Sequence, residues 1–176
     1  KTGSPLDGAF LVYDNKEEHM IFEDCIVDHN ASRERIGMGL LLAIYLQNHE
    51  NQKYYTDLEK YVKFVKREWY DEKTGYVYTI LGKDGNQLRL YDASWVAMLF
   101  AEMYYLTKDK VYLNDILKLF EVYYKIGGEK FYPNAVSILR IADAFKCAEM
   151  KKEYERLIEL FGNHVSNIMA NGTSYP

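Results

Sequence analysis

Apolar positions along the chain fall into six helical stretches that alternate between two patterns. The first pattern is apolar on nearly all sides, and it covers residues 32–49, 92–106 and 134–148. The second pattern has one apolar and one charged face, and it covers residues 53–70, 111–125 and 153–170. A helix that is apolar all round must be buried on most sides, whereas an amphipathic helix buries one face. The sequence therefore predicts three consecutive helical hairpins, each with a buried first helix and a half-exposed second helix.

Repeated helical hairpins either stack as an open solenoid or close into a toroid. A weak repeat supports the hairpins, since Tyr55, Tyr112 and Tyr154 each open a second helix after a short polar turn. The alternation favours closure, because a toroid encloses its first helices and exposes only the outer ring. The expected fold is all-α: a single, incomplete α/α-toroid domain over 1–176. We place an extended arm at 1–30 and the hairpins at 31–70, 92–127 and 133–171.

Two local features modify this helical pattern. Residues 75–91 alternate in the manner of a small β-hairpin, with Asp84-Gly85 as its turn. Residues 8–27 contain short stretches that fit either strands or extended arms. Gly37 and Gly39 lie inside the first helix, where glycine costs helix stability, so we expect them to permit close helix packing.

Composition excludes several classes of function. The net charge of −4, without a block of Lys or Arg, gives no electrostatic footprint for nucleic acid. No apolar run approaches the roughly 20 residues of a membrane span, so we expect a soluble protein. The two cysteines form no metal pattern, and we expect neither a metal nor a cofactor. The chain opens on Lys1 and closes in a loop-like segment, which we interpret as cuts within a longer protein. A targeting segment is therefore not observable.

Candidate chemistry gathers where the chain enters each first helix. In an up-and-down series of hairpins, these entries share one rim, and the helix N-termini there favour anionic groups. The candidate catalytic residues are Asp92, Asp28 and His29, since two carboxylates on different helices can divide general acid and base work. An equally simple interpretation makes each Asp only an N-cap.

Substrate-binding candidates lie along the same rim. Arginines suit carboxylate recognition, and aromatic side chains suit stacking against sugar rings. The candidates are Arg33, Arg35, Tyr78, Arg89, Tyr91, Trp95, Tyr132 and Asn134.

The turn Trp69-Tyr-Asp-Glu-Lys-Thr-Gly-Tyr76 and the helix from Tyr91 to Thr107 resemble the six-hairpin glycosidases. That superfamily includes unsaturated glucuronyl and rhamnogalacturonyl hydrolases, and the resemblance covers about residues 30–170. It implies an Asp near an inner-helix N-terminus as the acid/base, a position that Asp92 matches best and Asp28 next. The family uses six hairpins, whereas this chain has three, so the resemblance implies only a part of the toroid.

These observations lead to a carbohydrate-active enzyme as the first hypothesis. It would hydrolyse glycosidic bonds of uronic-acid-containing oligosaccharides or polysaccharides by carboxylate acid/base catalysis. The alternative within the enzymes is a polysaccharide lyase, in which His29 or a rim tyrosine abstracts the proton α to a carboxylate. The alternative outside them is a non-catalytic helical-repeat interaction module. We also expect an incomplete toroid to expose apolar surface that self-association would cover.

Overall fold

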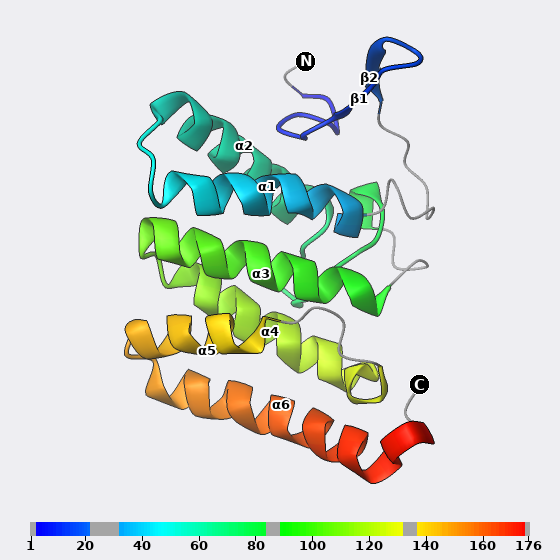
Figure 1. Ribbon diagram of the computed structural model, residues 1–176, viewed down its shortest axis with the longest axis vertical. Coiled ribbons are helices and arrows are strands. Elements are labelled where there is room, and N and C mark those ends of the chain that lie inside the picture. The colour runs from blue at the N-terminus through cyan, green and yellow to red at the C-terminus, as the bar shows by residue number, and fades with distance from the viewer. Residues whose placement is uncertain (1–2, 22–31, 84–88, 132–136, 175–176) are drawn as a thin grey trace.

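A computed structural model describes residues 3–21, 32–83, 89–131 and 137–174. In these ranges the chain forms three antiparallel helical hairpins (Figure 1), and the expected all-α fold class is confirmed. The hairpins are α1 (Ser32–Leu46) with α2 (Gln52–Glu68), α3 (Leu90–Thr107) with α4 (Val111–Lys125), and α5 (Ile138–Cys147) with α6 (Lys151–Asn171).

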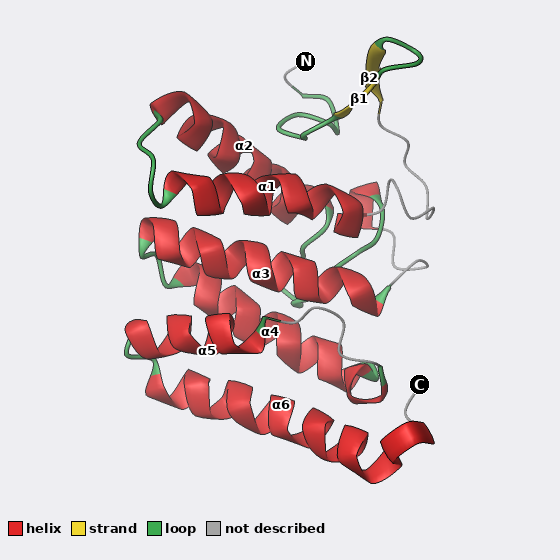
Figure 2. Ribbon diagram, viewed as in Figure 1, coloured by secondary structure: helices red, strands yellow, loops and turns green. Residues whose placement is uncertain are grey.

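The helices form two layers, as expected for part of an α/α toroid. The inner helix α3 packs against α1 on one side and against α5 on the other. The outer helices α2, α4 and α6 each pack against the inner helix of their own hairpin (Figure 2). All three inner helices run in the same direction, so their N-termini lie at one end of the layer (Figure 1). This end is called the rim below.

Burial of the inner helices depends on their place in the layer. From residue 92 to residue 104 of α3, only Trp95 and Met98 are not buried, as expected for a helix with neighbours on three sides. In contrast, α1 and α5 have an inner neighbour on one side only. Leu41 of α1 is 70% exposed and Leu139 of α5 is 80% exposed. The predicted apolar exposure of an incomplete toroid is therefore present at both edges of the layer.

A glycine lets α1 and α2 approach closely. A Cβ atom on Gly39 would lie 2.2 Å from Cε1 of Tyr61, which is closer than two carbon atoms can approach. The Tyr61 hydroxyl donates a hydrogen bond of 2.7 Å to the backbone carbonyl of Arg35 and so fixes the ring in this gap. The prediction of close packing is confirmed for Gly39. At Gly37 a Cβ would make only an ordinary contact, 4.0 Å from Trp95.

The two ends of the layer are connected differently. At the end opposite the rim, tight turns at residues 47–51, 108–110 and 148–150 join the helices of each hairpin. The Asn51 side chain caps α2 by accepting from the backbone N–H of Tyr54, and Lys108 and Glu149 turn the chain with positive φ angles. At the rim, the longer segments 69–89 and 126–137 lead from one hairpin to the next.

The small β-hairpin lies elsewhere than predicted. Strands β1 (Val12–Asp14) and β2 (His19–Ile21) pair antiparallel in the N-terminal arm, with Val12 opposite Ile21. The prediction of a β-hairpin over 75–91 is wrong for the described residues of that stretch. There, Val77 makes an isolated bridge to Tyr70, residues 81–83 form a 3-10 turn, and α3 already begins at Leu90. The predicted turn at Asp84-Gly85 lies outside the described residues.

The alternating pattern of 75–83 has a different cause from strand pairing. Val77 and Thr79 are buried because they pack against the helices, and Tyr78 between them is only half-buried. Gly82 and Lys83 then adopt positive φ angles, which end any extended run.

Candidate active site at the rim

Asp92 lies in the first turn of α3, at the rim, but its side chain is buried. The residue is 1% exposed, and the Thr79 hydroxyl donates a hydrogen bond of 2.8 Å to its Oδ2 atom. The N-cap position of α3 is Arg89, so Asp92 is not the capping residue that the simple interpretation required. Its negative charge still stabilises the positive end of the helix from the first turn.

A cluster of one arginine and two aromatic side chains lies on the rim. Its members are Arg89, Tyr91 and Phe131. The Arg89 guanidinium carbon lies 5.6 Å from the centroid of the Tyr91 ring, within the range of a cation–π contact. The Phe131 ring meets the Tyr91 ring edge to face, with centroids 4.7 Å apart. Tyr91 is therefore held between a residue that immediately precedes α3 and the segment that follows α4. Two of the predicted substrate-binding residues, Arg89 and Tyr91, are thus brought together.

His164 of α6 contacts this cluster through the backbone of Phe131. It is 1% exposed, and its Nε2 atom lies 2.8 Å from the carbonyl oxygen of Phe131. A carbonyl only accepts, so Nε2 carries a proton and donates. Its Nδ1 atom lies 3.4 Å from the Tyr124 hydroxyl. Sequence analysis missed His164, although a polar residue at helical spacing from Leu157 and Leu160 was the available signal.

The remaining described candidates take separate positions. Arg35 is 1% exposed and belongs to the core between α1 and α2. Trp95 is half-buried one turn beyond Tyr91, near Gly37 of the neighbouring inner helix. Tyr78 lies on the segment before α3, with its ring 6.3 Å from that of Tyr76, and burial raises the pKa of its hydroxyl. These three do not join the cluster of Arg89 and Tyr91 through any contact described here.

Several predicted site residues cannot be placed. Asp28, His29, Tyr132 and Asn134 lie outside the described residues, and so does the side chain of Arg33. Within the described ranges, no three His, Cys, Asp or Glu side chains gather in a way that could hold a metal ion. In the same ranges, no helix has the length and apolar character needed to cross a bilayer.

Comparison with known proteins supports the fold. The structure superposes on a solved structure of a polysaccharide lyase with a TM-score of 0.90 and 28% sequence identity. The match covers 100% of this chain and 27% of that chain, so this chain spans about a quarter of the length of the lyase. No model of a protein family matches the sequence. No curated protein sequence matches it either.

The likeness fits an α/α toroid of a carbohydrate-active protein.

Proposed function

We propose that this chain forms part of an α/α-toroid domain that cleaves a carboxylate-bearing polysaccharide by β-elimination. The observation that carries the proposal is the similarity of the whole chain to a polysaccharide lyase, at a TM-score of 0.90. The elimination alternative of the sequence analysis therefore takes precedence over hydrolysis.

The proposed reaction needs a base at a carbon next to a carboxylate. The base removes the proton from that carbon, and the electron pair forms a carbon–carbon double bond. The bond from the adjacent carbon to the glycosidic oxygen breaks, and this leaving oxygen then takes a proton. A positioned tyrosine or histidine can transfer both protons, because elimination requires no attacking water.

Tyr91 is the described residue that we assign to proton transfer. It lies at the rim, half-buried, with its ring fixed between Arg89 and Phe131. A fixed ring holds the hydroxyl at a constant position, which proton transfer requires. His29 and Tyr132, which precede inner helices in the sequence, remain our other candidates for this role. Arg33 remains our proposed carboxylate-binding residue.

Burial of Asp92 weighs against the hydrolytic alternative. A general acid must reach the glycosidic oxygen, directly or through one water molecule. The Asp92 carboxylate is instead enclosed and accepts a hydrogen bond from Thr79. This arrangement suits a residue that secures the segment before α3 better than one that contacts a sugar.

The two reactions differ in the ultraviolet absorbance of their products. The protein should be incubated with polymers of glucuronate, galacturonate and mannuronate, while absorbance and reducing ends are both recorded. Elimination produces a conjugated unsaturated sugar, so absorbance and reducing ends should rise together. Reducing ends without absorbance would indicate hydrolysis and contradict the proposal, and so would the absence of any cleavage.

A further inference from the structure

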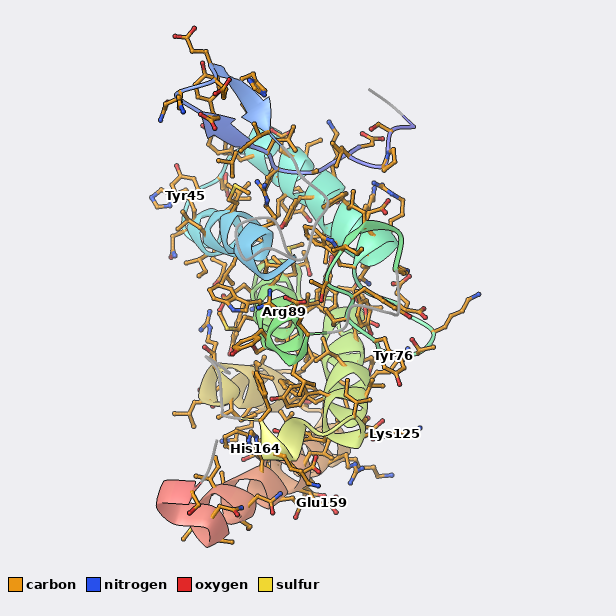
Figure 3. The ribbon with its side chains drawn as sticks, turned by 90° about the vertical axis from the view of Figure 1, so that its right-hand side faces the viewer. Tyr45, Tyr76, Arg89, Lys125, Glu159 and His164 are labelled. Atoms are coloured by element: carbon orange, nitrogen blue, oxygen red, sulfur yellow. The ribbon has the colours of Figure 1, made fainter. Side chains whose placement is uncertain are left out.

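A hollow of about 350 Å³ opens at the rim between α3, α4 and the segment that precedes α3. Arg89 and Tyr76, which both line it, lie on the side of the molecule that faces the viewer in Figure 3. The hollow lies between the inner helix α3 and the outer helix α4, and neither Tyr91 nor Phe131 is among the described residues that line it.

A turn closes one wall of the hollow. The Asp71 carboxylate accepts from the backbone N–H of Lys73 and from the Thr74 hydroxyl, and Gly75 then turns the chain with a φ angle of +83°. A Cβ atom on Gly75 would lie 2.7 Å from the carbonyl oxygen of Lys118, so only glycine lets this turn rest directly on α4. The side chain of the next residue, Tyr76, therefore borders the hollow.

The lining combines an apolar floor with few polar groups. Ala93 and Leu119 are buried and form part of the floor, while Tyr76 and Tyr123 contribute aromatic rings. Arg89 is the one residue with a charged side chain among the described residues that line the hollow. A largely apolar cavity with a few placed polar groups is typical of a ligand site, and about 300 Å³ is the lower end of the usual range. The hollow therefore suits one small, anionic and partly apolar group.

We propose that this hollow binds a single carboxylate-bearing sugar residue and serves as a subsite next to Tyr91. Aliphatic C–H groups of the sugar ring pack on the tyrosine rings, and the carboxylate accepts hydrogen bonds from the Arg89 guanidinium. This inference rests on the proposed function, since a polysaccharide supplies such residues along one chain.

Arg89 links the subsite to the proposed reaction centre. Its guanidinium lines the hollow and lies 5.6 Å from the centroid of the Tyr91 ring. A sugar held by Arg89 is thus adjacent to the sugar that faces Tyr91. The subsite would set which stretch of the polymer is presented for cleavage, without taking part in proton transfer.

Titration with single sugars separates binding at the hollow from any cleavage. The chain, labelled with ¹⁵N, should be titrated with glucuronate and, in parallel, with glucose, while backbone amide shifts are followed by NMR. We expect saturable shifts at Tyr76, Arg89 and Ile126 with glucuronate, and binding of glucose about tenfold weaker, because glucose lacks the carboxylate that accepts charged hydrogen bonds from Arg89.

Three variants complete the test. Arg89→Gln should weaken glucuronate binding about tenfold or more. Lys125→Gln is the matched control, because Lys125 is an exposed cation near the same end of α4 that does not line the hollow (Figure 3). It should change the affinity by less than about twofold. Ile126 lines the hollow and is 41% exposed, so Ile126→Trp should obstruct the mouth and abolish binding while the thermal melt stays unchanged.

The subsite is overturned by equal affinities for glucuronate and glucose, by unchanged affinity in Arg89→Gln, or by the absence of saturable shifts around the hollow. These results are independent of catalysis. Binding of glucuronate without cleavage of any polymer would support the subsite and contradict the elimination. Cleavage of a polymer with unchanged amide shifts would support the elimination and contradict the subsite.

Discussion

Arg140 of α5 donates two hydrogen bonds to the carboxylate of Glu102 of α3. Its Nε and Nη2 atoms each lie 2.8 Å from one of the carboxylate oxygens. The side-chain amide of Gln47, just after α1, donates to the same carboxylate over 2.7 Å. One buried carboxylate therefore joins all three inner helices.

This network makes the stability of the layer dependent on pH. Burial alone would raise the pKa of Glu102, but hydrogen bonds from Arg140 and Gln47 hold that pKa below its usual value. A carboxyl group whose pKa is lower in the folded state adds stability above its unfolded pKa, about 4.3, and loses it as pH falls through the folded pKa. We expect the free energy of unfolding to decrease as the pH falls from about 5 to 3. Urea unfolding at a series of pH values measures this decrease in the free energy of unfolding.

Glu102→Gln should remove part of this pH dependence, because glutamine does not titrate. Glu59→Gln is the matched control, since Glu59 is exposed on the outer helix α2. It should unfold with the pH dependence of the unchanged chain. If the Glu102→Gln variant keeps that dependence in full, the network does not contribute through its charge.

Gly39 and Gly162 both lie inside helices, yet alanine should have opposite effects at the two positions. At Gly39 the added methyl group would overlap the Tyr61 ring, so Gly39→Ala should destabilise the chain by about 1–3 kcal/mol. At Gly162 a Cβ would meet nothing within 4 Å, so Gly162→Ala should stabilise α6 by up to about 1 kcal/mol through helix propensity. Chemical denaturation of both variants gives the comparison. A neutral effect at Gly39 would show that α1 and α2 can separate without cost.

Single substitutions of Thr79 and of Asp92 should destabilise the chain by different amounts. Thr79→Val keeps the shape of the side chain but removes the donor, leaving a buried carboxylate short of one hydrogen bond. We expect a cost of about 1–3 kcal/mol. Asp92→Asn keeps an oxygen that can accept from Thr79, so it should cost less. Thermal unfolding of both variants tests this order, and the reverse order would mean that the charge of Asp92 matters more than its hydrogen bond.

Tyr91→Phe should separate proton transfer from structure. Phenylalanine retains the ring that contacts Arg89 and Phe131 but lacks the hydroxyl group. Loss of a general acid or base typically lowers turnover about 100-fold or more, while the thermal melt should stay nearly unchanged. Tyr13→Phe is the matched control, because Tyr13 is 50% exposed on β1 in the N-terminal arm. Near-normal turnover of the Tyr91→Phe variant would transfer the role to His29 or Tyr132.

Periodicity predicted the helices well because the two types of helix are buried to different extents. A helix that is apolar all round is buried on most sides, whereas an amphipathic helix buries one face. Apolar residues around all of α3 required neighbours on most sides, and the structure supplies them on three. The same reasoning failed at 75–83, where alternation arose from packing of Val77 and Thr79 against helices. A period of two indicates that alternate side chains are buried, but it does not say that a second strand buries them.

The candidate site was harder to predict than the fold. Position along the chain was sufficient to place Arg89 and Tyr91 at the rim, since each lies at the start of an inner helix. It could not show that Asp92, three residues after Arg89, is enclosed, because burial there depends on Thr79 from a separate segment. His164 was missed for a similar reason. Its partner is a backbone carbonyl on the segment after α4, and no local pattern records such a contact.

The contrast between tight turns at one end and long segments at the rim has a consequence for diversification. The turns at 108–110 and 148–150 each join the two helices of one hairpin, so an insertion there would disturb how those two helices pack. The longer segments 69–89 and 126–137 join one hairpin to the next and carry Tyr76, Arg89 and Ile126, which we assign to sugar contact. In related proteins, these two segments can therefore differ in sequence and length while the six helices stay the same. Such differences would change which polymer is preferred.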